Sequence, residues 1–157
     1  MTNLKVGEKA PDFFLKDKDG KIYSLKDIKS DYVIVYFYPR DNTPGCTIEA
    51  KNFTTDLSEF KKLKTAIIGI SGGDEKSKTK FCKDHNLKIT LLSDPDFSVC
   101  KKYNSYGKKS FMGREFMGIF RNTFVLDKNK KIMKIYEKVD PKIHSEELIN
   151  FIKSQEK

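Results

Sequence analysis

A long apolar run that stops at a proline and leads into a helix start constrains the fold more than any other feature. Residues 32–38 are β-branched or aromatic, and Pro39 follows them. Such a run is typical of a strand that is buried on both faces in the middle of a sheet, and proline ends it. Shortly afterwards Thr43 can cap a helix and Pro44 can occupy its first position. The chain therefore needs a layered α/β fold in which a helix begins beside the end of a central strand.

Strand and helix patterns alternate along the rest of the chain. Strands that alternate with helices and end in a hairpin predict an α/β fold with a mixed central sheet flanked by helices. The order is that of a thioredoxin-like fold with an added N-terminal β-hairpin, and we expect residues 1–157 to form a single domain. In chain order, we expect a hairpin at 13–15 and 21–24, a helix from 43 to about 60, a strand at 65–70, a helix after the turn at 72–74 that ends near 85, a strand at 89–92, a short helix at 97–103, an irregular loop at 104–119, a hairpin at 122–126 and 131–136, and a last helix opened by Asp140 and Pro141.

The sequence predicts a cytoplasmic protein. Its first residues lack the apolar core of a signal peptide. The longest apolar run has seven residues, whereas a membrane helix needs about 20. We therefore expect no membrane association. Three cysteines, an odd number, do not suggest a secreted disulfide framework, and a reducing compartment would keep them as thiols.

The positive charge does not by itself indicate a function. Lys and Arg number 31 against 22 Asp and Glu, a net charge of +9 that invites a nucleic-acid reading. The lysines, however, occur as scattered doublets between acidic and apolar residues, and neither an RNA-binding aromatic motif nor zinc-finger spacing is present. We interpret the charge as a solvated lysine-rich surface and expect no nucleic-acid partner. A nucleic-acid module remains an alternative, which steep salt dependence of DNA binding would favour.

Cys46 is the candidate reactive residue. With Thr43 as the cap and Pro44 at the first position, Cys46 occupies the third position of the expected helix. Unpaired amides and the helix dipole favour an anion there, and the thiolate is the reactive form of cysteine. Gly45 would let a small substrate approach the backbone. The alternative is a cysteine that acts only as a small buried apolar residue.

These residues resemble a known family. The stretch 36–50, with Pro39, Thr43 and Cys46 at their characteristic spacing, resembles the active-site segment of peroxiredoxins. It is most similar to the Q-type, or bacterioferritin comigratory protein, subfamily. Segments 7–13, 68–71, 91–94 and 121–124 also match in order, so the resemblance covers nearly the whole chain.

The resemblance implies an enzyme, a thioredoxin-dependent thiol peroxidase acting on hydrogen peroxide or organic hydroperoxides, and it implies roles for individual residues. Cys46 would attack the peroxide and become a sulfenic acid. Thr43 would hydrogen-bond the peroxide, and Arg121 would pair with thiolate and substrate. Pro39 would shield the pocket, and Glu49 would orient the arginines. Ionising such a thiol raises the attack rate only about two- to threefold, because a more stable thiolate is a weaker nucleophile. Most of the rate would therefore come from Thr43, Arg121 and backbone amides.

The same resemblance implies a resolving cysteine. Many Q-type members carry it five residues after the peroxidatic one, where this chain has Lys51. Another arrangement places it on the next helix, and Cys82 fits that arrangement. A Cys46–Cys82 disulfide would then be reduced by an external dithiol, with thioredoxin as the expected partner. A core cysteine without redox function is the alternative for Cys82. Many Q-type members are monomers, and we expect a monomer here.

The sequence gives weaker support to other roles for the cysteines. Cys100 is interpreted as a structural thiol, and no cofactor is expected. Cys82 and His85 lie three apart on one helix, but no second closely spaced pair supports a metal site. A dithiol oxidoreductase acting on protein disulfides is the alternative enzyme. It would place a second cysteine three residues after Cys46, and Glu49 stands there instead.

Overall fold

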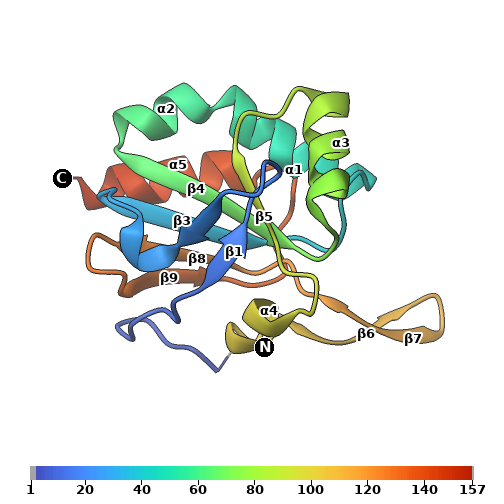
Figure 1. Cartoon of the computed structure of the whole chain (residues 1–157). Helices are drawn as coiled ribbons and strands as arrows, with labels where there is room; N and C mark the ends of the chain where they lie inside the picture. The colour runs from blue at the N-terminus through green and yellow to red at the C-terminus, as the bar shows by residue number, and fades with distance from the viewer. Residues whose placement is uncertain (1–2, 157) are drawn as a thin grey trace.

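A seven-stranded mixed sheet forms the centre of the molecule in a computed structural model that describes residues 3–156 (Figure 1). Its strand order is β2-β1-β5-β4-β3-β8-β9. β3 lies in the interior, parallel to β4 and antiparallel to β8, and all of its residues are buried. The expected α/β thioredoxin-like fold with its N-terminal hairpin is confirmed. The strands of this sheet are β1 Phe14–Lys16, β2 Ile22–Ser24, β3 Tyr32–Phe37, β4 Thr65–Ser71, β5 Thr90–Ser93, β8 Thr123–Asp127 and β9 Ile132–Tyr136.

Four helices cover one face of the sheet and bury an apolar core against it. α1 (Pro44–Thr55), α2 (Leu57–Lys62), α3 (Glu75–His85) and α5 (His144–Gln155) each contribute side chains to this core. It contains both Cys46 and Cys82. The two cysteines thus lie on the same side of the sheet, on separate helices.

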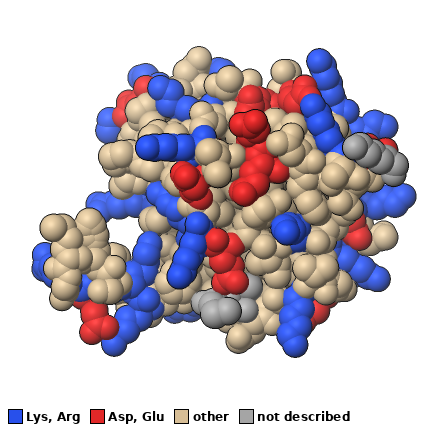
Figure 2. All heavy atoms as spheres, turned by 180° about the vertical axis from the view of Figure 1, so that it is seen from behind, with Lys and Arg blue, Asp and Glu red and all other residues tan. Residues whose placement is uncertain are grey.

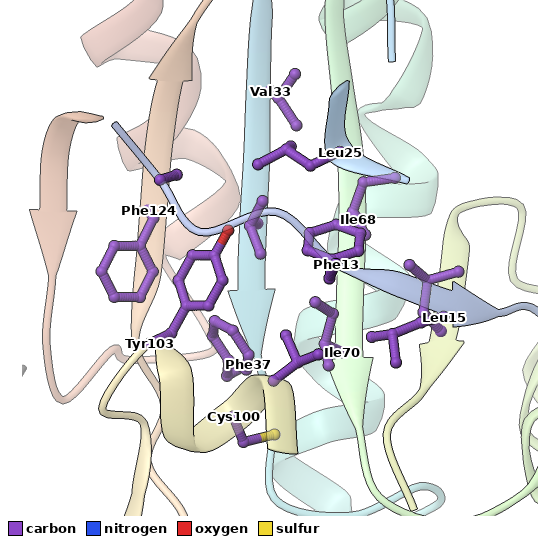
Figure 3. Packing of buried hydrophobic residues seen from close by; sticks show 14 of the residues in the cluster. Phe13, Leu15, Leu25, Val33, Phe37, Ile68, Ile70, Cys100, Tyr103 and Phe124 are labelled. Carbon is purple, nitrogen blue, oxygen red and sulfur yellow. The ribbon is translucent and has the colours of Figure 1, made fainter. Parts of the chain in front are cut away.

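The opposite face is covered by the N-terminal segment, the 3-10 helix Leu25–Asp27 and α4 (Ser98–Lys102). Figure 3 shows Phe37 of β3 and Phe124 of β8 packing with Tyr103, which follows α4. Cys100 lies in this core, so the sheet separates it from the other two cysteines.

Two helix boundaries differ from the sequence prediction. The expected helix at 43–60 is divided into α1 and α2 at Asp56, whose carboxylate accepts a hydrogen bond from Ser145 of α5 at 2.7 Å. The last helix begins at His144, because the Asp140 carboxylate holds the amide of Lys142 and keeps 141–143 in a turn.

The expected irregular loop at 104–119 is wrong. β6 (Tyr106–Phe111) and β7 (Arg114–Ile119) form an antiparallel hairpin that projects from the body of the molecule (Figure 1). Met112 and Gly113 both have positive φ, as a tight hairpin turn requires. Both faces of the hairpin are largely exposed, so its sequence lacks the apolar alternation that marks a half-buried strand.

Candidate active site

The start of α1 is built as the sequence predicts. Thr43 is the N-cap in extended conformation, Pro44 opens the helix, and Cys46 lies in its first turn. The Thr43 hydroxyl donates to the carbonyl oxygen of Arg40 at 2.9 Å instead of accepting from a helix amide. The amides of Gly45 and Cys46 lie where helical geometry offers no carbonyl partner. The helix therefore presents donors beside the sulfur.

Arg121 contacts two side chains of α1, those of Cys46 and Glu49. Arg121, two residues before β8, donates from Nη2 to the Cys46 Sγ at 3.2 Å and from Nη1 to Glu49 Oε1 at 3.2 Å. Cys46 and Glu49 are buried, while about a fifth of the Arg121 side chain is exposed. Burial raises the pKa of Glu49 to about 7, and the neighbouring Arg121 guanidinium opposes that rise. The geometry thus fixes the guanidinium between a thiol and a carboxyl group.

Gly45 makes room for this guanidinium. A Cβ atom at position 45 would lie 2.7 Å from Arg121 Nη2 and 3.5 Å from Pro141 Cγ. The glycine is therefore needed for close approach, since any side chain there would push Arg121 away from the Cys46 sulfur.

Arg121 contacts the buried Cys46 sulfur and also borders a surface pocket. Its side chain lines a pocket of about 620 Å³ together with Lys109, Phe120 and Val139. Pro39 lines a different pocket, of about 490 Å³, with Asp41 and Gly72 beside the N-terminus of α3. The structure thus brings Cys46, Glu49 and Arg121 together, with Thr43 three residues before the cysteine, and it places Pro39 at a pocket other than the one that Arg121 lines.

Cys82 is buried in the third turn of α3, and burial raises the pKa of its thiol. All three cysteines are free. Cys100 is fully buried, its amide donates to the Asp94 carboxylate at 2.8 Å, and burial together with Asp94 raises the pKa of its thiol strongly. Cys82 therefore lies in the same core as Cys46, whereas Cys100 lies in the core on the other side of the sheet.

Sequence reasoning missed two buried groups near the site. The Tyr36 hydroxyl of β3 is buried and has no hydrogen-bond partner among the described residues, and burial near Glu49 and Cys46 raises its pKa. Lys78 of α3 is fully buried in an ion pair with Asp41. The signal for Lys78 was its spacing: it lies three and four residues before Phe81 and Cys82, on the inward face of the helix.

The charged surface is mixed. On the face drawn in Figure 2, lysines and arginines are dispersed and acidic side chains lie among them. No group of three or more potential ligand residues between 3 and 156 could hold a metal ion. Within the same span, the helices are all too short or too polar to cross a bilayer.

A cysteine in the first turn of a helix, in contact with an arginine beside a thioredoxin-like sheet, is typical of thiol peroxidases. Comparisons with known proteins indicate the same class. The model of the AhpC/TSA family matches residues 6–135. A putative peroxiredoxin Bcp of Helicobacter pylori is 42% identical over 95% of this chain and 98% of its own length. Peroxiredoxin Bcp of Escherichia coli is 37% identical over 98% of both chains.

Solved structures extend the likeness to the fold. Peroxiredoxin Q of Xanthomonas campestris superposes with a TM-score of 0.88 at 29% identity, covering 99% of both chains. A mutant of the Xylella fastidiosa PrxQ superposes with a TM-score of 0.93 at 26% identity over the whole of both chains. This chain belongs to the AhpC/TSA family and, within it, to the Q-type peroxiredoxins, so it is a thiol peroxidase.

Proposed function

We propose that this peroxiredoxin reduces hydrogen peroxide and organic hydroperoxides through Cys46, resolves the product with Cys82, and is recycled by thioredoxin. The contact between the Arg121 guanidinium and the Cys46 sulfur carries the proposal, because it places a fixed positive charge where thiolate and peroxide meet. Alkyl peroxide reduction is named for the Xanthomonas campestris relative, which supports organic hydroperoxides as substrates here.

In the first step the Cys46 thiolate attacks one peroxide oxygen. An S–O bond forms, the O–O bond breaks, and the other oxygen leaves as water or an alcohol after taking up a proton. Arg121 and the first-turn amides stabilise the negative charge that develops on the oxygens. Because the Thr43 hydroxyl donates its hydrogen bond to the Arg40 carbonyl oxygen, the lone pairs of the hydroxyl oxygen can accept a hydrogen bond from the peroxide O–H and orient it. Glu49 holds the guanidinium in place. Pro39 lines a separate pocket with Asp41 and Gly72, and we propose that it shields the site from that side.

In the second step the Cys82 thiol attacks the sulfenic sulfur. The S–S bond forms, the S–O bond breaks, and the hydroxide leaves as water with the Cys82 proton. An external dithiol then reduces the disulfide and is itself oxidised to a disulfide. We propose thioredoxin as that dithiol, a monomer as the working form and the cytoplasm as the compartment. Three free cysteines in one chain support a reducing environment.

Replacing Thr43 by valine should separate peroxide reduction from thiol reactivity. Thr43→Val removes the oxygen that orients the peroxide but leaves Arg121 and the helix start in place. We expect the rate constant for peroxide reduction to fall by about 100-fold or more. Alkylation of Cys46 by iodoacetamide should stay close to the wild-type rate, and Thr43→Ser should recover most of the peroxidase activity. Equal losses in both assays would contradict this division of roles.

The resolving residue is tested by a non-reducing peptide map after one equivalent of peroxide. We expect a Cys46–Cys82 crosslink, because both residues belong to the core on the helical face. In Cys82→Ser, peroxide should still oxidise Cys46, while turnover with thioredoxin should stop. A Cys46–Cys100 link or an intermolecular Cys46 dimer would overturn the assignment of Cys82.

A further inference from the structure

The short segment between β3 and α1 is bonded to both ends of the helix that carries Cys82. At the N-terminal end of α3, the Asp41 carboxylate oxygen Oδ2 accepts from Ser77 Oγ at 2.6 Å and from Lys78 Nζ at 2.9 Å. Asp41 also accepts from the Tyr38 hydroxyl at 2.6 Å through Oδ1. Both of its oxygens are therefore engaged.

Lys78 makes this attachment a buried one. Its side chain is fully buried, that of Asp41 is 5% exposed, and the Lys78 ammonium also donates to the Gly72 carbonyl oxygen at 2.6 Å. The Tyr38 ring lies beneath the same ammonium, 5.7 Å away. A buried ion pair with its remaining sites hydrogen-bonded resists separation, because opening it leaves an uncompensated charge.

Asn42 makes the second attachment, at the C-terminal end of α3. Its Nδ2 donates to Asp84 Oδ2 at 3.2 Å, and its Oδ1 lies 2.7 Å from His85 Nε2. Asn42 has a φ of 63°, which asparagine and glycine adopt at less cost than other residues. The side chain is exposed, so this end can be altered without opening the core.

Cys82 lies between the two attachments, one turn after Lys78 and just before Asp84. Cys46 lies one turn beyond Asn42 along the chain. We propose that Asp41, Asn42 and Lys78 are positioning residues for disulfide formation: they clamp α3 to the segment that leads into α1, and their release sets the rate at which Cys82 reaches the oxidised Cys46. This inference rests on the proposed function, in which Cys82 resolves the sulfenic acid.

With the clamp closed, the protein is arranged for oxidation of Cys46 by peroxide and not for disulfide formation with Cys82. Both sulfurs are buried in regular helices, and Arg121 holds that of Cys46. Bond formation needs the two Cα atoms within about 7 Å and the Cys82 sulfur in line with the S–O bond. Local opening of α3 supplies that freedom, and movement of α3 away from the segment at 41–42 breaks the clamp.

Asn42→Gly tests the clamp with little risk to the fold. Glycine adopts the positive φ at low cost and removes the side-chain amide that contacts Asp84 and His85. We expect disulfide formation to become about three- to tenfold faster, the change that follows from losing hydrogen bonds of ordinary net strength. Oxidation of Cys46 should keep its wild-type rate. Rapid mixing with peroxide, acid quenching, alkylation of remaining thiols and intact mass measurement separate the two steps.

A charge exchange provides the matched control. Asn42→Asp places a carboxylate against Asp84, so it should also accelerate disulfide formation. Adding Asp84→Asn restores the hydrogen bond with the donor now at position 84 and the acceptor at position 42. The rate of disulfide formation in the double variant should return towards the wild-type rate. In excess peroxide, Asn42→Gly should accumulate less sulfinic acid, because the sulfenic acid is consumed sooner.

The outcomes distinguish the clamp from the function on which it rests. A wild-type protein that forms the Cys46–Cys82 disulfide, together with an Asn42→Gly variant whose disulfide forms at the same rate or more slowly, overturns the clamp alone. A wild-type protein that forms no such disulfide overturns the assignment of Cys82 and the clamp with it. A variant in which both steps change equally also counts against the clamp, since general loosening of the fold would not separate them.

Discussion

Arg121→Met should lower the rate constant for oxidation of Cys46 by about 100- to 1000-fold, the loss found when one fixed donor is removed from a developing oxyanion. The guanidinium donates directly to the Cys46 sulfur, and methionine offers no donor there. The protein should stay folded. The pKa of Glu49 is already about 7 and would rise further without Arg121, so the buried carboxyl would be neutral rather than an unpaired charge.

The measurement is a competition between this protein and a heme peroxidase for limiting hydrogen peroxide, which reports the first step. Arg114→Met on the exposed hairpin is the matched control, because it removes the same charge from the net total outside the site. Arg121→Lys should recover little activity, since one ammonium cannot contact Cys46 and Glu49 through two separate nitrogens. A loss below tenfold in Arg121→Met would contradict the role given to the guanidinium.

Lys78→Met should destabilise the protein by about 3–5 kcal/mol, because it leaves the Asp41 carboxylate buried without its cation. For a chain of this size the loss corresponds to a fall in Tm of roughly 6–20 °C. Urea denaturation followed by circular dichroism measures the free energy of unfolding. Converting Asp41 to asparagine in the same chain should recover part of the loss, since no buried charge would then remain.

Lys80→Met is the control for this prediction. Lys80 lies two residues further along α3 and pairs with Asp84 at 2.8 Å, but its side chain is 72% exposed. Surface ion pairs contribute little to the free energy of unfolding, so the Tm of Lys80→Met should hardly differ from that of the wild type. Similar losses in the two variants would mean that burial of Lys78 has no energetic consequence beyond helix composition.

Local chemistry explains why most of the fold could be predicted. The run at 32–38 indicated an interior strand, and β3 is buried throughout. The helix after the turn at 72–74 was predicted to end near residue 85, and α3 does end at His85, with Asn86 as its cap at a positive φ of 52°. The hairpin at 106–119 was not predicted. Its strands are held by backbone pairing and are largely exposed, whereas the hydrophobic pattern of a sequence indicates strands that are buried on at least one face.

The site was predictable to the extent that the chain itself brings residues together. Thr43 and Cys46 share one helix start, so spacing places them. Arg121 lies 75 residues from Cys46, and only the resemblance to peroxiredoxins connected them. The ion pair between Asp41 and Lys78 could not be predicted. Lys78 is one of several lysines in α3, and Asp41 follows β3, whereas α3 follows β4. Tertiary contacts of this kind depend on how β3 and α3 pack, which no local pattern encodes.

The close approach at Gly45 has a consequence for how this sequence can vary. The space that a Cβ atom would take at position 45 is occupied by the end of the Arg121 side chain. That end is flexible, so alanine at 45 would not prevent folding; it would displace the guanidinium from the sulfur. The residue at position 45 therefore constrains the side-chain conformation at position 121. A homologue with the arginine in the same contact with the cysteine sulfur should have glycine at position 45.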